Sequence, residues 1–207
     1  MAGARGRFIT LEGIDGAGKS SHVQFIADRV REKGVHVIDT REPGGTRMGE
    51  DLRKVVLHEP MGVRAEAFLM FGARSEHVVK VIEPALAAGH WVLCDRFSDA
   101  SYAYQCGGHG LPRATFDALV AALQPAPVPD ATFYFDVDPA LAAERQQGRQ
   151  RAADRFEREQ VDFFRRVRDA YLERARAESG RIHVIDGSGS FEQVRSRLAA
   201  ALAPVLA

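Results

Sequence analysis

The chain has 207 residues, of which 45% are apolar and 27% charged, a composition typical of an ordinary globular domain. A chain of this length is expected to form one domain whose core needs no disulfide or structural metal. Its 28 basic and 28 acidic residues cancel, whereas general nucleic-acid or membrane-surface binders usually carry a basic excess. These counts exclude a disordered or collagen-like chain and predict no nucleic-acid and no membrane partner.

The two cysteines, Cys94 and Cys106, are too few for a disulfide framework and lack the C-x-x-C spacing of a zinc site. The first seven residues carry charge but no apolar run of the kind that a secretory signal contains. The longest nearly uncharged apolar stretch, 198–207, is far shorter than the roughly 20 residues that a membrane span requires. A cytoplasmic location is therefore expected.

Five short apolar runs, rich in β-branched or aromatic residues, predict β-strands. In chain order they are 8–11, 35–38, 91–94, 132–135 and 182–185, and acidic residues follow them. Between the strands, apolar residues spaced i, i+3, i+4 and i+7 predict helices, most clearly at 23–30, 164–175 and 191–205. Strands that are apolar on both faces and separated by helices are typical of a parallel sheet covered on both sides. We therefore expect one α/β domain over residues 1–207, with a five-stranded parallel sheet flanked by helices.

One compositional break interrupts this pattern. The stretch 146–153 is polar and bears arginines, and we interpret it as a mobile loop inside the domain. Asp154 and Glu157 follow it, and because acidic residues are favourable in the first turn of a helix, 154–157 is expected to open the next helix.

A glycine-rich segment follows the first predicted strand and opens the first helix. Residues 13–20 read G-I-D-G-A-G-K-S and match G-x-x-x-x-G-K-[ST] in full. Glycines let the backbone N–H groups face a phosphate, and the helix N-terminus adds positive potential. Lys19 reaches the β- and γ-phosphates, and the Ser20 hydroxyl can bind magnesium. A glycine-rich turn that only caps a helix is the alternative, but the full motif in this context predicts a nucleoside triphosphate site. Its expected ATP-binding residues are Gly13, Ile14, Asp15, Gly16, Ala17, Gly18, Lys19, Ser20 and Ser21.

The residues after the third predicted strand distinguish between classes of nucleotide-binding protein. A GTPase would carry N-K-x-D and a D-x-x-G element, but the sequence has no N-K-x-D and this strand is followed by Asp95-Arg96-Phe97. A carboxylate at the end of a strand beside the phosphate loop suits a magnesium ligand, which makes Asp95 a candidate. Arg96 beside it is natural for an enzyme that holds a second phosphate opposite the first.

Four segments together resemble bacterial thymidylate kinases: 12–20, the T-R-E-P-G-G-T block at 40–46, Asp95-Arg96-Phe97 and Tyr104-Gln105. They occur in the family's order and with plausible spacing over most of the chain. The resemblance implies a three-layer P-loop kinase fold with a mobile, arginine-rich lid at about 145–155. It also implies transfer of the γ-phosphoryl group of ATP to dTMP with Mg²⁺, giving dTDP and ADP for dTTP synthesis. A homodimer formed by helix packing is implied as well.

The resemblance also implies roles for individual residues. Lys19 clamps the donor phosphates, Arg96 bridges toward the acceptor phosphate, and Arg53 holds that phosphate unless it is only a solvated helix residue. Asp15 accepts a hydrogen bond from the 3′-hydroxyl or helps organise magnesium, or else only stabilises its loop. The full set expected at dTMP is Asp15, Glu42, Pro43, Arg53, Phe71, Arg74, Arg96, Ser101, Tyr104 and Gln105.

Recognition of the base is expected on the predicted helix 66–74 and on the segment 101–105. Arg74 hydrogen-bonds the exocyclic oxygen of thymine, while Ser101 and Gln105 meet the other edge of the base. Phe71 is the expected stacking residue because stacking favours an aromatic ring, although Met70 lies one helical turn before Arg74. Tyr104 crowds the 2′ position and so favours deoxyribose. Ser20 and Asp95 are the expected magnesium ligands.

Arginines near residue 150 are the expected lid residues. Gly16 stands where some family members place a catalytic arginine, and in the branch without it, lid arginines close over the phosphates. Arg149 and Arg151 are therefore expected to be catalytic together with Lys19, Arg96 and Asp15, the alternative being a solvated basic face. Cys106 and His109 depart from the glycine and arginine that are common in the family.

Two other functions stay open on the residues alone. One is another nucleoside or nucleotide kinase on the same scaffold, with an acceptor such as a deoxynucleoside, dUMP or CMP. The other is a nucleotide-dependent binding or switch protein without transfer activity. The T-R-E-P-G-G-T block and Asp95-Arg96 favour a kinase, because a switch has no use for a second phosphate clamp.

Overall fold

The structure is a computed structural model that describes residues 5–146, 154–157 and 159–207. Five parallel strands form one sheet in the order β2-β3-β1-β4-β5, which confirms the predicted five-stranded parallel sheet. The strands are β1 (Phe8–Glu12), β2 (Val37–Arg41), β3 (Trp91–Asp95), β4 (Ala131–Asp136) and β5 (Ile182–Asp186). All five side chains of β1 are buried, since β1 lies at the centre of the sheet with helices on both faces.

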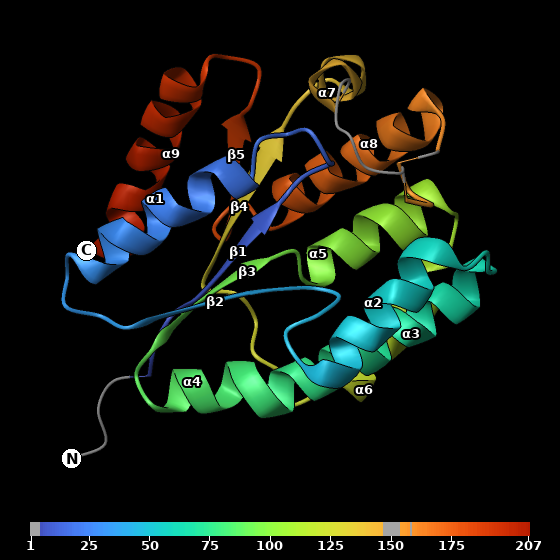
Figure 1. The fold of residues 1–207 in the computed structure, drawn as a ribbon, viewed down its shortest axis with the longest axis horizontal. Helices are drawn as coiled ribbons and strands as arrows, with labels where there is room; N and C mark the ends of the chain where they lie inside the picture. Colours follow the sequence, from blue (N-terminus) through green and yellow to red (C-terminus); the bar gives the residue numbers. More distant parts are fainter. Residues whose placement is uncertain (1–4, 147–153, 158) are drawn as a thin grey trace.

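Helices cover the two faces of the sheet, with α1 and α9 together on one side and α4, α5 and α8 on the other (Figure 1). Two segments, η1 and η2, are π-helical, and η2 follows directly on α5. The helical elements are α1 (Ser20–Arg31), α2 (Arg47–His58), α3 (Val63–His77), η1 (Val78–Ile82), α4 (Glu83–Ala87), α5 (Ser98–Ser101), η2 (Tyr102–Gly108), α6 (Arg113–Ala122), α7 (Pro139–Gln146), α8 (Val161–Ala177) and α9 (Phe191–Leu206). Within the ranges that the structure covers, no helix is long and apolar enough to cross a membrane.

The second strand begins two residues later than predicted, at Val37 rather than Val35, and continues through Arg41. β2 is an edge strand that pairs only with β3, beginning with Val37 opposite Trp91. Only Val37 is fully buried in this strand. An edge strand tolerates polar residues, so the apolar run in the sequence did not show where this strand begins and ends.

The predicted helix faces are shifted at their first turns. His22 is buried in α1 where Val23 is only partly buried, and Phe163 is buried in α8 where Phe164 is only partly buried. The ring of His22 stacks on that of Phe191 at the start of α9, with centroids 4.7 Å apart. The imidazole packs as a flat ring between Phe135 and Phe191, and its buried Nδ1 has no hydrogen-bond partner among the residues described.

The segment 154–157 does not open a helix, which corrects the expectation from its acidic residues. It forms a turn, and α8 begins only at Val161. Arg155 anchors this turn to α2, because its backbone N–H donates to the carbonyl of Leu57 at 2.9 Å and its Nε to the carbonyl of Val56 at 3.2 Å. These tertiary hydrogen bonds replace the helical ones that the sequence pattern suggested.

Candidate active site

The carboxyl ends of β1, β2 and β3 bring the predicted motifs to one edge of the sheet. The phosphate loop follows β1, the segment with Glu42 and Pro43 follows β2, and Arg96 follows β3. In open parallel sheets this edge is where ligands bind. The three motifs, more than 80 positions apart at their extremes, therefore face a common cleft.

Two glycines explain why the phosphate loop can take its shape. Gly13 has a φ of +138° and a Cβ there would lie 2.7 Å from the carbonyl oxygen of Phe135. Gly16 has a φ of +87° and a Cβ there would lie 2.3 Å from the carbonyl oxygen of Ala142, on α7. Any other residue would strain the backbone and displace a neighbouring strand or helix.

Lys19 lies inside this loop. Its Nζ donates to the carbonyl oxygens of Gly13 at 2.8 Å and Ile14 at 3.3 Å, and the side chain is buried. Burial, followed by the positive charge of Arg96, lowers the pKa of Lys19 below its ordinary value. The ammonium group is thus held where the backbone curls around a phosphate position.

Ser20 and Asp95 line one open hollow next to the loop. Ser20 begins α1 and is exposed. Oδ1 of Asp95 is buried and has no hydrogen-bond partner among the residues described. A hydroxyl and a carboxylate oxygen left without a partner are the oxygen donors that Mg²⁺ prefers, so these two residues fit the predicted metal site.

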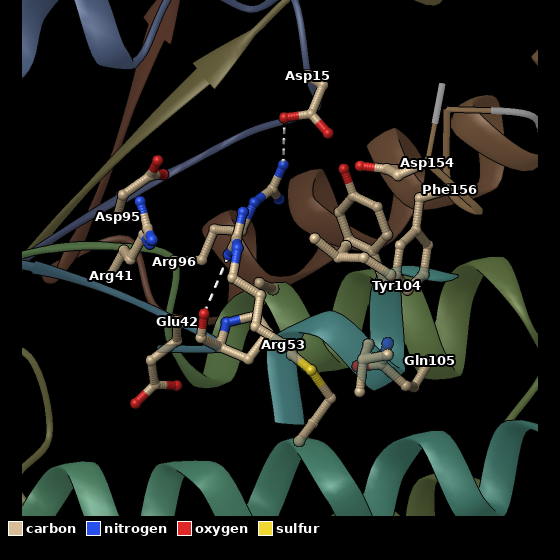
Figure 2. Close-up of a pocket in the computed structure, with 15 residues that line it drawn as sticks. Asp15, Arg41, Glu42, Arg53, Asp95, Arg96, Tyr104, Gln105, Asp154 and Phe156 are labelled. Atoms are coloured by element: carbon tan, nitrogen blue, oxygen red, sulfur yellow. Dashed lines mark hydrogen bonds and ion pairs between the residues drawn. The ribbon is translucent and has the colours of Figure 1, made fainter. Parts of the chain in front are cut away.

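Arg96 connects the phosphate loop with the rest of the cleft. Its Nη2 donates to Oδ1 of Asp15 at 3.0 Å (Figure 2), and its guanidinium lies 4.9 Å from the centroid of the Tyr104 ring. Its Nη1 has no partner in the described part of the chain. The φ of Arg96 is +71°, a conformation that non-glycine residues adopt rarely and that often marks functional sites.

Two further arginines approach Arg96. Arg53 and Arg41 line the same cleft, and Arg53 Nη1 donates to the carbonyl of Pro43 at 3.0 Å (Figure 2). Burial, and then the charges of Arg41 and Arg96, lower the pKa of Arg53. Like charges held this close favour an anion between them. The cleft is lined by Asp15, Arg41, Glu42, Pro43, Arg53, Val56, Leu57, Met70, Asp95, Arg96, Ala100, Tyr104, Gln105, Asp154 and Phe156.

Arg74 lies fully buried beneath this lining. Its Nε donates to Oε2 of Glu42 at 2.6 Å, and its Nη2 donates to the carbonyl of Phe97 and to the hydroxyl of Ser101, both at 3.0 Å. His77 holds the other oxygen of Glu42 at 2.9 Å. Nη1 of Arg74 is buried without a partner in the ranges covered by the structure. Ser101 thus contacts Arg74 and does not line the cleft.

The structure brings Met70 to the cleft and leaves Phe71 in the core. The Phe71 ring packs edge-on against Phe116 at 5.8 Å, and the guanidinium of Arg74 lies 4.7 Å from its centroid. Met70 lines the cleft, as its position one turn before Arg74 indicated. The opposite aromatic lining residue is Phe156, which sequence reasoning missed because it assigned 154–157 to a helix.

Tyr104 and Gln105 come from η2 and line the same cleft. The Tyr104 ring packs edge-on against Phe156 at 5.6 Å, and its hydroxyl is buried without a hydrogen-bond partner in the described ranges. Gln105 Nε2 donates to Oε1 of Glu66 at 2.7 Å, while its own Oε1 is buried and unpaired within those ranges. Gln105 therefore lines the cleft with an amide oxygen that has no partner in the part of the chain that the structure describes.

The predicted lid arginines, Arg149 and Arg151, lie outside the described residues. Of the neighbouring residues, Gln146 Nε2 donates to the carbonyl of Asp15 at 2.8 Å, and Arg145 Nη1 donates to the carbonyl of Gly187 at 2.8 Å. The end of α7 therefore touches both the phosphate loop and the segment after β5. A second hollow beside the loop is lined by Ala17, Gly18, Ser21, His22, Arg145, Gly187, Gly189, Phe191 and Val194.

Comparison with known proteins identifies the family of this chain. The sequence model of the thymidylate kinase family matches residues 11–198. The thymidylate kinase of Thiobacillus denitrificans is 55% identical over 194 residues, which cover 94% of this chain and 95% of that protein. The thymidylate kinase of Burkholderia mallei is 50% identical over 204 residues, covering 97% and 98% respectively.

Solved structures give the same result. The crystal structure of thymidylate kinase from Ehrlichia chaffeensis superposes with a TM-score of 0.76 at 33% identity, covering 96% of this chain and 99% of that one. Because sequence and fold agree along almost the whole chain, the resemblance is confirmed and the chain belongs to the thymidylate kinase family.

Proposed function

We propose that this chain transfers the γ-phosphoryl group of ATP to dTMP, giving dTDP and ADP in the supply of dTTP. The observation that carries the proposal is the meeting of two anion sites, the phosphate loop and the arginine-lined cleft, at the contact between Asp15 and Arg96. Phosphoryl transfer between two anions depends on charge neutralisation and in-line positioning, and two facing sites provide both. A switch protein has no use for the second site.

ATP is the donor, and residues 13–21 bind its phosphates. Lys19 neutralises the β- and γ-phosphates from inside the loop. Ser20 and Asp95 would hold Mg²⁺, which supplies positive charge to the phosphate oxygens when it is bound. The hollow between Arg145 and Phe191 is the place for the adenine, because it adjoins the loop and is partly apolar.

The acceptor phosphate lies between Arg53 and Arg96. Arg96 Nη1, buried and unpaired among described residues, supplies one donor, and the adjacent Arg53 supplies the second charge. Arg149 and Arg151 are proposed as the arginines that close over the transferred group. The contact of Gln146 with the Asp15 carbonyl supports this, because it ties the preceding helix to the phosphate loop.

Two buried atoms that lack partners in the described ranges, Arg74 Nη1 and Gln105 Oε1, support thymine as the base. One is a donor and the other an acceptor. Thymine offers the complementary pair, the acceptor O4 and the donor N3–H, whereas cytosine offers a donor and an acceptor in the reverse order. Met70 and Phe156 contact the faces of the ring, and Ser101 acts by holding Arg74.

The sugar lies near Tyr104 and Asp15. The buried ring of Tyr104, wedged between Phe156 and the guanidinium of Arg96, leaves little room for a 2′-hydroxyl. Asp15 accepts a hydrogen bond from the 3′-hydroxyl. Glu42 and Pro43 complete this side of the cleft through Arg74 and Arg53.

We further propose a homodimer formed by helix packing. Large apolar side chains are exposed on α2 and α3, with Phe68 58%, Met48 43% and Val55 40% exposed. Exposed apolar side chains that lie on neighbouring helices are typical of a protein–protein contact. Sedimentation equilibrium of the wild-type chain tests this part of the proposal.

A coupled assay of ATP consumption, run with Mg²⁺ over a panel of nucleoside monophosphates, tests the function. We expect dTMP to give the highest kcat/KM, with dUMP weaker and dCMP and AMP far below both. If dTMP gives no more turnover than dCMP or AMP, the proposed function is wrong. A mass shift from dTMP to dTDP identifies the product directly.

A further inference from the structure

A buried carboxylate on α3 holds one of the atoms assigned to the base. Glu66 is fully buried and is not among the residues that line the cleft. Its oxygens accept from Gln105 Nε2 at 2.7 Å, from Arg155 Nη2, and from His109, whose Nδ1 lies 3.2 Å away. Burial alone would raise the pKa of Glu66, but the hydrogen bonds from His109, Arg155 and Gln105 outweigh it and lower the pKa. The ion pair with Arg155 and the donors from Gln105 and His109 surround the carboxylate oxygens and favour the ionised form.

The charge state of Glu66 fixes the orientation of the neighbouring amide. An ionised carboxylate accepts hydrogen bonds and donates none, so Gln105 must turn its NH₂ group toward Glu66. The amide oxygen then points the other way, and this is the buried oxygen without a partner in the described part of the chain. If the amide were flipped, two oxygens would face each other at Glu66 and the amide would present a donor in the cleft.

We propose that Glu66 is a specificity-determining positioning residue: by holding the Gln105 amide in one orientation, it makes the cleft accept pyrimidines with an N3–H and reject cytosine. The inference rests on the proposed function, because it takes Gln105 to contact the base. A flipped amide would match the unprotonated N3 of cytosine and would repel the N3–H of thymine. Selectivity for the base therefore depends on a residue that does not touch it.

The second atom assigned to the base, Arg74 Nη1, is also held in place by a buried carboxylate. Glu42 holds Arg74 Nε at 2.6 Å, and the carbonyl of Phe97 and the hydroxyl of Ser101 hold Nη2, which leaves Nη1 as the remaining donor. Each base-reading side chain is thus oriented by its own buried carboxylate, Glu42 for Arg74 and Glu66 for Gln105. Because the two arrangements are separate, the contribution of Glu66 can be measured while Arg74 stays in place.

The test compares kcat/KM for dTMP and dCMP in the wild type and in Glu66→Gln. A glutamine at 66 can present either a donor or an acceptor, so Gln105 loses its fixed orientation. Since one buried mismatch costs on the order of 1.4 kcal/mol, the dTMP-to-dCMP preference is expected to fall about tenfold. His109→Leu is the matched control, because it removes another donor to Glu66 and leaves Gln105 bonded. Its preference should equal that of the wild type even if both rates fall.

A swapped pair provides a rescue. In Glu66→Gln/Gln105→Glu the amide at 66 donates to the carboxylate at 105, whose second oxygen is again an acceptor in the cleft. The preference for dTMP should return to within a few-fold of the wild type. Rates for both substrates that fall equally in Glu66→Gln, with the preference unchanged, would show that Glu66 only supports the fold and would overturn the inference.

The proposed function fails in a different way, namely if the wild type itself shows no preference for dTMP over dCMP. Should Glu66→Gln not fold, the wild type provides the test by NMR of its ¹⁵N-labelled side-chain amides. One Gln105 NH₂ proton bonded to a carboxylate is expected to resonate downfield and to exchange slowly. Two ordinary, rapidly exchanging protons would overturn the inference.

Discussion

The carboxylate of Asp15 and the guanidinium of Arg96 meet at 3.0 Å although the two residues are 81 positions apart in the chain. In the proposed function this contact joins the loop that binds ATP to the cleft that binds dTMP, so Arg96 would serve both phosphates. Replacing Arg96 with alanine should therefore weaken stabilisation of the transition state strongly and change the affinity for ATP only slightly.

We expect Arg96→Ala to lower kcat by about 10³-fold, the effect typical of losing an arginine that stabilises a transferring phosphoryl group. Steady-state kinetics with dTMP, together with the Kd of ATP from calorimetry, measure this. Arg96→Lys is the control that keeps the charge and loses the two-pronged geometry. An ATP affinity that falls as much as kcat would mean that Arg96 belongs to the donor site.

Met70 and Phe71 are adjacent in sequence but are expected to respond differently to substitution. Phe71 packs in the core, so Phe71→Ala should lower the free energy of unfolding by about 3 kcal/mol. Met70 lines the cleft, so Met70→Leu, which conserves volume, should raise the KM for dTMP with little change in stability. Denaturant unfolding and initial-rate kinetics on both variants check this. The reverse outcome would place the aromatic ring at the base.

His109 is predicted to make the stability depend on pH. It lies between Glu66 and Glu159, with Nδ1 at 3.2 Å from one carboxylate and Nε2 at 3.1 Å from the other. Burial alone would lower the pKa of His109, but these two carboxylates outweigh it and raise the pKa above the ordinary value. The charged form is therefore favoured in the folded state, and its contribution is complete below the unfolded pKa near 6.5.

That contribution should be lost as the pH rises through the raised pKa of the folded state. In His109→Arg, which carries the residue common in the family, the charge persists and about 1 kcal/mol of stability should be retained at high pH. The melting temperature of wild type and variant, followed from pH 6 to 9, gives the comparison. Parallel curves would show that His109 does not carry the charge.

Glu12 is predicted to lower the stability of the fold as the pH rises, whereas an ordinary ion-paired carboxylate raises it. It is fully buried, and its oxygens accept from the backbone N–H of Phe97 at 2.7 Å and the hydroxyl of Tyr171 at 2.8 Å. Burial, and then the charge of Asp99, raises its pKa from 4.5 to about 8. The folded chain therefore holds a proton that the unfolded chain releases above pH 4.5.

Because the folded state binds more protons, the stability contributed by neutral Glu12 falls as pH rises from about 4.5 to about 8. The free energy of unfolding changes by up to about 5 kcal/mol over this window, at 1.36 kcal/mol for each pH unit. Glu12→Gln, which mimics the neutral acid, should flatten this part of the profile, as measured by urea unfolding at several pH values. An unchanged slope in the variant would show that Glu12 is ionised throughout.

Contiguous sequence patterns predicted where the elements around the candidate site lie. Strand runs and the G-x-x-x-x-G-K-[ST] spacing are contiguous patterns, and the order of the sheet then brings Asp95 and Arg96 to the phosphate loop. The sequence analysis chose Phe71 for its aromatic ring, but the structure packs Phe71 in the core and places Met70 in the cleft. Their spacing to Arg74 was the available signal.

Contacts between distant segments could not be predicted from the sequence. Glu66 binds Gln105, 39 positions away, and Arg155, 89 positions away, and no local pattern marks either bond. Phe156 enters the cleft because Arg155 ties its turn to α2, whereas the acidic residues around it suggested a helix. The length of the edge strand β2 also depends on a contact between distant segments. Its bounds are set by pairing with β3 and not by its own composition.

The packing of Gly16 against α7 limits how this enzyme can change in evolution. An arginine at this position would have to displace the carbonyl of Ala142, which a Cβ would approach to 2.3 Å. The end of that helix holds the Asp15 carbonyl through Gln146 and the Gly187 carbonyl through Arg145, so the displacement would spread to both. A chain that acquires only the arginine at position 16 is therefore expected to be impaired. Position 16 and helix α7 are expected to change together between lineages, and natural sequences with a bulky residue at one should carry a compensating difference in the other.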